Sequence, residues 1–295
     1  MPLDILVPFW GELAMLRQTV DSVLAQTDDD WLLTVIDDDY PGTEVAEYFA
    51  GIDDPRVRYV RNETNVGITE NFRRCVRAAT QERIAVVGCD DILLPNYVEV
   101  VRAAHAAHPT VDIIQPGVQV IDETGTARTT LVDVVKQRVV RPRTRGRRIV
   151  GGEPLATSLL TGDWLYWPSL AMRRERLLEV DFRDGFPIIQ DLALVIDLVA
   201  SGSSVLIDTT VCFGYRRHSE SASAVRLVDG SRFEGERAYF DVAARLMTDL
   251  GWKRAAFAAR ARVTSRAHAL TLLPKVLLAR DARGAKVLAR HAFLP

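Results

Sequence analysis

Short apolar runs alternate with longer amphipathic segments along the first 120 residues of the chain. The short runs are rich in β-branched residues, which predicts strands at 3–9, 31–37, 56–60 and 83–88. The segments between them place apolar residues at helical spacing, which predicts helices at 12–27, 43–51 and 71–80. Apolar strands that alternate with helices are typical of a parallel sheet covered on both faces. This part of the chain is therefore predicted to be an α/β unit.

The remaining residues predict a second mixed unit and a helical end. A helix at 95–108 is followed by a strand and a turn at 111–122. Residues 153–218 are predicted to be mixed, with a helix at 188–202 and then a hairpin formed by SVLIDTT and VCFGYRRH. Residues 231–295 show spacing for two or three helices and no strand pattern.

Acidic residues follow two of the predicted strands. Asp37, Asp38 and Asp39 come after the second strand, and Asp90 and Asp91 come after the strand at 83–88. In parallel sheets, ligands bind beyond the carboxyl ends of the strands. Polar turns are also common there, so either cluster alone is as consistent with a solvated turn as with a ligand-binding site. Two clusters at one edge favour a binding site.

Adjacent carboxylates make a hard oxygen site that suits Mg²⁺ or Mn²⁺. Such an ion usually takes one or two carboxylates together with substrate phosphates. The chain has neither the Gly-Lys-Ser/Thr of a P-loop nor a G-x-G-x-x-G fingerprint. Asp90 and Asp91 are therefore predicted to hold a metal that binds a diphosphate, with basic side chains supplying the remaining contacts.

Composition narrows the class of protein. The chain has 295 residues, of which 48% are hydrophobic and 26% charged, with a formal net charge of −2. A nucleic-acid-binding protein normally has a basic excess, so no nucleic-acid partner is predicted. Three widely spaced cysteines suit a reducing compartment. Without a signal-like start or an uncharged apolar run of about 18 residues, a cytoplasmic protein is predicted.

An ordered series of segments carries a family resemblance: ILVPFWGE, TVDSVLAQT, LLTVIDDD, ETNVGITENFRRCVRAA, VVGCDDILLP, WPSLAMRRE, IIQDLAL and YRRHSESAS. In this order they resemble the family 2 glycosyltransferases over residues 3–223. The resemblance implies the nucleotide-sugar-binding fold called GT-A, a Rossmann-like, mostly parallel sheet with helices on both faces. It divides the chain into a catalytic domain at 1–225, with a nucleotide-binding half (1–110) and an acceptor-side half (111–225), and a helical extension at 226–295.

The same resemblance implies roles for individual residues. Those implied in nucleotide binding are Pro8, Phe9, Glu12, Asp37 or Asp38, Asn65, Gly67, Asn71, Arg73 and Asp90. Asp90 is the implied principal metal ligand, Asp91 its neighbour and His218 a late ligand to the metal or diphosphate. Asp191 matches the catalytic base.

Two positions depart from the family pattern. An acidic residue is common at the place held by Gly88 or Cys89, so the acidic motif is one carboxylate shorter here. The residue before the base is usually Glu, but here it is Gln190, which leaves Asp191 as the single carboxylate at that place.

The implied chemistry is one displacement at an anomeric carbon. A metal with Arg or His neutralises the leaving diphosphate, and one base within about 3 Å activates the acceptor hydroxyl. A single base and a single metal site predict inversion, whereas a glycosidase needs two carboxylates that flank the bond. The predicted donor is a nucleoside-diphosphate sugar, and the predicted acceptor is a glycan, a glycolipid or a small molecule. Trp164 and Trp167 are predicted either to be core residues or to stack on this acceptor.

Basic residues gather in two segments, with seven at 136–148 and ten at 252–295. A helix spanning Lys275–Arg290, begun by Pro274, would separate a basic side from a side that carries Leu277, Leu278 and Leu288. Its leucines either pack on the catalytic domain or lie on an anionic membrane surface. The second alternative predicts peripheral contact with the inner face of the cell membrane.

Two other functions compete with glycosyl transfer. A sugar-phosphate nucleotidylyltransferase is disfavoured because PFWGELA replaces the Gly-rich basic loop expected after its first strand. A catalytically impaired scaffold subunit is disfavoured because Asp90, Asp91, Asp191 and His218 occur together, although the shortened acidic motif leaves it open.

Overall fold

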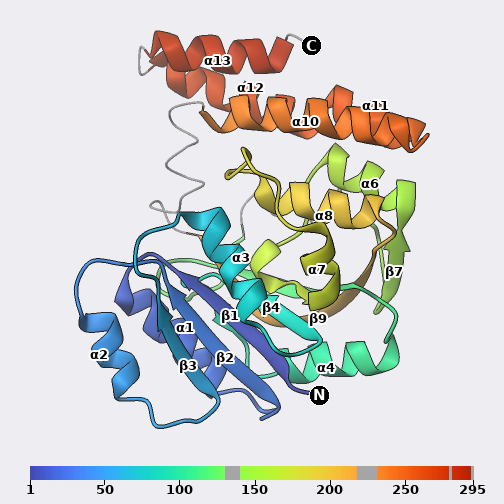
Figure 1. Ribbon diagram of the computed structural model, residues 1–295. Helices are drawn as coiled ribbons and strands as arrows, with labels where there is room; N and C mark the ends of the chain where they lie inside the picture. The colour runs from blue at the N-terminus through green and yellow to red at the C-terminus, as the bar shows by residue number, and fades with distance from the viewer. Residues whose placement is uncertain (130–139, 218–230, 279–280, 294–295) are drawn as a thin grey trace.

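The computed structural model describes residues 1–129, 140–217, 231–278 and 281–293 (Figure 1). In the described residues, nine strands form one sheet in the order β3-β2-β1-β4-β8-β6-β9-β5, with β7 paired to β9. This α/β arrangement, with helices around the sheet and a helical C-terminal region, confirms the predicted fold class.

The four strands predicted for the N-terminal half are all present and parallel. They are β1 (Leu3–Phe9), β2 (Trp31–Asp37), β3 (Val57–Arg61) and β4 (Arg83–Val86). The helices that connect them are α1 (Leu13–Leu24), α2 (Glu44–Ala50) and α3 (Ile68–Ala78). Because all four strands run the same way, their carboxyl ends lie at one edge of the sheet.

Alternation along the strands builds a core on each face of this sheet. Leu6 packs in one buried cluster with Cys75 and Val76 of α3. The next residue, Val7, packs in a second cluster with Val20 of α1. Successive side chains of a strand point to opposite faces, so a strand that is apolar throughout requires helices on both sides.

The second half of the sheet is mixed. Antiparallel β8 (Ala171–Arg173) joins β4 to β6 (Ile113–Ile121). The outer strands are β9 (Ser204–Arg216), β5 (Ile92–Leu93) and β7 (Arg148–Gly151). The helices of this half are α4 (Tyr97–Ala107), α6 (Gly152–Thr161), α7 (Arg174–Val180), α8 (Gln190–Ala200) and the 3₁₀ turn η2 (Trp167–Ser169).

The predicted hairpin near 204–218 is wrong, because residues of both its arms lie in the single strand β9, which continues to Arg216. β9 runs parallel to β6, and pairing passes from Gln115–Ile207 to Gly117–Val211. The extra residues of β9 form a bulge against Gly117, where an added Cβ would lie 2.7 Å from the carbonyl carbon of Thr210. A bulge bends a strand without reversing it.

The C-terminal region contains four described helices, more than the predicted two or three. They are α10 (Ser231–Asp249), α11 (Lys253–Ala261), α12 (Val263–Leu278) and α13 (Ala282–Phe293). α10 and α11 share a buried cluster with α6 and α8. α12 and α13 pack with Phe233 in a smaller cluster of their own and lie farthest from the sheet in Figure 1. The predicted domain boundary at 225 stays a prediction.

The single helix predicted across Lys275–Arg290 is wrong. Pro274 lies inside α12, which ends at Leu278, and α13 begins only at Ala282. Leu288 of α13 is buried, whereas Leu277 and Leu278 at the end of α12 are 59% and 86% exposed. Across the described residues, no helix combines the length and apolar character needed to cross a membrane.

Candidate active site

Asp37, the last residue of β2, is fully buried and hydrogen-bonded within the protein. The backbone N–H of Tyr40 donates to its Oδ1 (2.7 Å), and the hydroxyl of Tyr59 donates to its Oδ2 (2.6 Å). Burial, aided by this hydrogen bond, raises the pKa of Tyr59 far above its usual range. The Asp37 carboxylate therefore holds the turn after β2 in place.

Asp38 organises the loop that leads into α3. Its Oδ1 accepts hydrogen bonds from the side chain of Asn62 (2.8 Å) and the N–H of Val66 (2.9 Å), and its Oδ2 accepts one from the N–H of Gly67 (2.9 Å). Asn65 also accepts a bond from Gly67 N–H (3.1 Å). Gly67 has φ +82°, a left-handed conformation that favours glycine. Predicted residues 38, 65 and 67 therefore do lie together.

Asn71 extends this network onto α3. Its amide donates to the carbonyl of Ile36 (3.1 Å) and accepts from the amide of Asn62 (3.1 Å). Arg74, one turn further along α3, donates to Oδ1 of Asn62 (2.7 Å). Neither Asn62 nor Arg74 is among the residues predicted from the sequence. The signal was the three-residue spacing of Asn71 and Arg74, which places both on one face of the helix.

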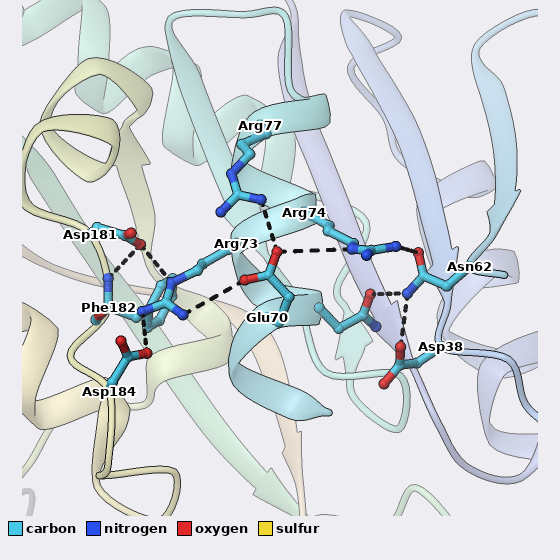
Figure 2. A network of polar contacts seen from close by, with 10 residues as sticks. Asp38, Asn62, Glu70, Arg73, Arg74, Arg77, Asp181, Phe182 and Asp184 are labelled. Atoms are coloured by element: carbon cyan, nitrogen blue, oxygen red, sulfur yellow. Dashed lines mark hydrogen bonds and ion pairs between the residues drawn. The ribbon is translucent and has the colours of Figure 1, made fainter. Parts of the chain in front are cut away.

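Arg73 is a correction to the predicted nucleotide site. Its guanidinium points away from Asn62 and towards Asp181 and Asp184, in the segment before α8 (Figure 2). There it donates to Asp181 (3.1 Å), to the carbonyl of Phe182 (2.6 Å) and to Asp184 (2.8 Å). Neighbouring residues on a helix point about 100° apart, so Arg73 and Arg74 serve opposite flanks of α3.

At the end of β1, Phe9 is also a correction, because its side chain is fully buried in the core and does not line a pocket. Pro8 is half-buried in the strand, and Glu12 is exposed just before α1. Trp10, between them, is 53% exposed and meets the ring of Tyr40 edge-on at 5.3 Å. Trp10 is not among the residues predicted from the sequence. The feature that could have identified it is the position of an aromatic residue directly after a strand, at the ligand-binding edge.

The carboxylates of Asp90 and Asp91 both lie over Gly88, just beyond β4. An added Cβ on Gly88 would lie 2.6 Å from Oδ2 of Asp91 and 2.8 Å from Oδ1 of Asp90. A side chain at position 88 would therefore displace one or both carboxylates. Burial raises the pKa of the Cys89 thiol to about 12, so this thiol stays protonated near neutral pH.

Asp91 is buried, whereas Asp90 is partly exposed. Oδ1 of Asp91 accepts the backbone N–H of Arg216 (2.8 Å), and the buried Arg216 side chain donates to the carbonyl of Asp90 (2.6 Å) and to Gln18 (2.7 Å). Burial, and then the charge of Asp90, raise the pKa of Asp91. Arg216, missed by the sequence analysis, is thus what anchors this acidic turn to α1.

Asp191 lies in the first turn of α8 and is partly exposed. The phenol of Tyr215, on β9, is affected by the charge of Asp191 and by the charges of the acidic turn. Burial is the main reason that the pKa of the Tyr215 phenol is raised, and the carboxylates of Asp91, Asp90 and Asp191 raise it further because they lie near it. The ring of Tyr166 packs against Tyr215 with centroids 5.1 Å apart. Three predicted carboxylates therefore lie within electrostatic range of one partly buried phenol.

Trp164 and Trp167 are core residues, which corrects the predicted acceptor platform. Trp164 is 1% exposed and Trp167 is 9% exposed. Trp167 packs edge-on against Phe72 and Phe182. Rings enclosed in this way have no free face for a sugar. His218 lies outside the described residues.

The acidic turn suits a metal that completes its shell with substrate. Among the described residues, no group of three His, Cys, Asp or Glu side chains is placed to hold a metal ion. Asp90 and Asp91 instead offer two carboxylates over one glycine, and the charge of each is unfavourable for the other. A bound divalent cation would relieve that repulsion, and Mg²⁺ and Mn²⁺ accept such a partial set of protein ligands.

Solved structures resemble the fold over its whole length. The S. aureus TarS fragment 1–349 in complex with UDP-GlcNAc aligns with 99% of this chain and 82% of its own, at a TM-score of 0.72 and 12% identity. A second structure of the TarS fragment 1–349 aligns with 99% of this chain and 81% of its own, at a TM-score of 0.69 and 12% identity. At this identity the likeness concerns the fold.

Sequence comparisons give the family. A putative colanic acid biosynthesis glycosyl transferase, WcaA of Escherichia coli (strain K12), is 28% identical over 102 residues, 34% of this chain and 37% of that protein. An uncharacterized protein of Sinorhizobium fredii, y4gI, is 31% identical over 127 residues, 42% of this chain and 14% of that protein. The aligned part thus spans well under half of either relative. Residues 4–180 match the model of glycosyl transferase family 2, and the chain is a member of that family of glycosyltransferases.

Proposed function

We propose that the protein transfers a glycosyl group from a nucleoside-diphosphate sugar to an acceptor hydroxyl, with a divalent metal and with inversion at the anomeric carbon. The observation that carries the proposal is that the charges of Asp90, Asp91 and Asp191 all raise the pKa of the Tyr215 phenol, which indicates that the three carboxylates share one region of the protein. A metal-binding pair and a separate carboxylate, placed near each other, supply the two things that this displacement needs: charge neutralisation and a base.

The nucleoside is proposed to bind at the ends of β1 and β2. Trp10 presents an exposed ring beside Tyr40, and an indole face of this kind stacks on a nucleobase. The Asp38 loop lies at the same edge, where Asn65 is exposed to solvent. The TarS structure that was solved with UDP-GlcNAc supports a sugar nucleotide as the class of donor.

Asp90 and Asp91 would hold Mn²⁺ or Mg²⁺, which would neutralise the diphosphate as it leaves. Asp90 is the better exposed of the two and would make the main contact. The backbone of Arg216 keeps one oxygen of Asp91 occupied at 2.8 Å, so Asp91 orients the turn and offers its other oxygen.

Asp191 is the proposed base. Its carboxylate takes the proton of the acceptor hydroxyl, whose oxygen forms a bond to the anomeric carbon. The bond from that carbon to the diphosphate oxygen breaks, and the electron pair leaves with the nucleoside diphosphate. Attack and departure occur on opposite faces of the sugar in this single step, so the anomeric configuration inverts.

The acceptor is proposed to be a glycan, a glycolipid or a small molecule, met in the cytoplasm or at the inner face of the membrane. Leu277 and Leu278 support membrane contact, because both are exposed at the end of α12. On the neighbouring α13, Lys286 and Arg290 are exposed and would attract anionic lipid.

A thermal-shift screen tests the proposal. UDP-, GDP- and dTDP-sugars are each added with and without Mn²⁺, and the melting temperature is recorded. One sugar nucleotide should raise it, and more so with Mn²⁺, because a ligand that binds only the folded state stabilises that state. A scaffold without donor binding would respond to none of them. A nucleotidylyltransferase also binds a sugar nucleotide, as its product, so it is distinguished by a second assay: it would form the sugar nucleotide from a nucleoside triphosphate and a sugar phosphate, which a glycosyltransferase would not.

A further inference from the structure

Helix α3 lies between the Asp38 loop and the segment that carries Asp181 and Asp184 (Figure 2). One flank carries Asn71 and Arg74, which bind Asn62 in the Asp38 loop. The other flank carries Thr69, whose hydroxyl donates to Gln190 (2.6 Å), the residue directly before Asp191. The helix therefore contacts both the proposed donor loop and the start of the helix that bears the proposed base.

Arg73 makes the densest contacts on the second flank. Within four residues of chain it binds the Asp181 carboxylate (3.1 Å), the Phe182 carbonyl (2.6 Å) and the Asp184 carboxylate (2.8 Å). The Arg73 side chain is only 15% exposed and its bond to the Phe182 carbonyl is partly buried, whereas the carboxylates of Asp181 and Asp184 are 53% and 87% exposed. A fixed guanidinium with three acceptors on one segment restrains that segment more than a single surface ion pair would.

The segment that Arg73 holds has an unfavourable backbone conformation of its own. Asp181 has φ +56°, which is uncommon for a residue with a side chain. The ring of Phe182 is packed against Phe72 and Trp167, with centroids 5.7 and 5.8 Å away. A conformation of this kind persists only when its surroundings enforce it. Residues 181–189 then lead directly into α8.

We propose that Arg73 is a positioning residue, which holds residues 181–189 and thereby places Asp191 against the donor. Its neighbour Arg74 instead supports the donor loop through Asn62. The proposal rests on Asp191 being the base of the proposed function. Glu70 connects the two flanks, since it lies 3.6 Å from Arg73 and 3.9 Å from Arg74 and also accepts a bond from Arg77 (2.8 Å).

The test separates binding from turnover in three matched variants of the full chain. Binding is the calorimetric affinity, with Mn²⁺, for whichever of UDP, GDP and dTDP binds best. Turnover is the release of that nucleotide from its sugar donor. Arg73→Met should lower turnover at least ~10-fold and leave affinity within about twofold, because a displacement of ~1 Å can cost ~10²-fold in rate. Arg74→Met should weaken affinity. Arg77→Met, an exposed neighbour, should change neither.

A double mutant distinguishes positioning from general support. If Arg73 acts through Asp191, Arg73→Met should cause no further loss in the Asp191→Asn background. If the double mutant loses turnover by the product of the two single losses, the proposal is overturned. Normal turnover of Arg73→Met alone would overturn it as well. Arg73→Lys keeps the charge but cannot reach three acceptors, so it should fold normally and lose part of the turnover. A fall in affinity and melting temperature together with turnover in both Arg73 variants would mean a merely structural role. Normal turnover of Asp191→Asn alone would instead contradict the proposed function on which the inference rests.

Discussion

At the scale of single residues, the absence of a side chain at position 88 lets two carboxylates share one space. One oxygen of Asp91 and one of Asp90 lie only 2.6 and 2.8 Å from the position that a Cβ on Gly88 would take. The family's usual third carboxylate would not fit at Gly88 without a shift of this turn. In the shorter acidic motif, the space that a side chain at position 88 would need is therefore taken by the carboxylates of Asp90 and Asp91.

Gly88→Ala should weaken Mn²⁺-dependent nucleotide binding at least ~10-fold and lower the free energy of unfolding by about 1 kcal/mol. The atoms that must move are the ends of two Asp side chains, and one of them, Asp91, is buried and bonded to the backbone of Arg216. The shared geometry of the two carboxylates is lost as well. Titration calorimetry with UDP, GDP and dTDP measures the effect. Gly51→Ala is the control, since its Cβ would find ordinary contacts at 3.5 Å. Equal affinities in both variants would contradict the assignment of the turn.

Asp191→Asn should lower turnover at least ~10²-fold, which is the low end for loss of a general base. The amide keeps the shape of the side chain and its hydrogen bond to the backbone, but it cannot accept the acceptor's proton. Nucleotide affinity should stay the same, because Asp191 is proposed to contact the acceptor. Steady-state rates with the donor found in the screen provide the measurement. Turnover close to that of the unchanged protein would require another base.

At the scale of elements, the α12–α13 pair holds a buried histidine. His291 of α13 is 2% exposed, and its Nε2 lies 2.7 Å from the hydroxyl of Ser265 on α12. Burial lowers its pKa, Arg262, Arg237 and Arg266 lower it further, and Glu236 opposes them. The folded protein therefore holds His291 neutral.

The free energy of unfolding should fall as the pH drops below about 6.5, the ordinary pKa of histidine. Below that value the unfolded chain binds a proton that the folded chain binds only at a lower pH. Urea unfolding between pH 7.5 and 5.5 measures the change. His291→Gln does not titrate, so its unfolding midpoint should move less with pH than that of the unchanged protein. Parallel pH dependences would show that His291 is not the group responsible.

The sequence predicts the N-terminal strands and helices well because buried strands between helices leave a clear pattern. It fails at β9, since Asp208, Thr209 and Thr210 are typical turn residues that here form a bulge against Gly117. The sequence correctly predicts that Asp38 and Gly67 lie close together, because both follow parallel strands and the carboxyl ends of such strands lie at one edge of the sheet. Side-chain direction is less accessible: Arg73 and Arg74 are adjacent yet serve different flanks, and the burial of Trp164 depends on helices distant in sequence.

At the scale of the whole molecule, the C-terminal helices give the enzyme a second surface beyond the catalytic edge. Leu277 and Leu278 are exposed at one end of α12, and basic residues lie on the adjacent α13. Each surface Lys or Arg contributes about 1 kcal/mol of attraction to anionic lipid, so a few acting together favour binding.

The protein should co-sediment with anionic vesicles at low salt and less well as salt rises. The double substitution Leu277→Glu and Leu278→Glu should remove binding, because it opposes both insertion and attraction. Leu178→Glu changes an exposed leucine of α7 and should leave binding intact. If the unchanged protein stays in the supernatant at low salt, the membrane contact is wrong and a soluble acceptor is indicated.

The central claim is that the carboxylates beyond β4 bind the donor's diphosphate through a metal. Calorimetric titration of UDP, GDP and dTDP into the unchanged protein and Asp90→Ala, each with and without Mn²⁺, tests it most directly. Mn²⁺ should strengthen binding of one nucleotide to the unchanged protein and have no such effect on Asp90→Ala. Equal strengthening in both proteins, or none in the unchanged protein, would contradict it.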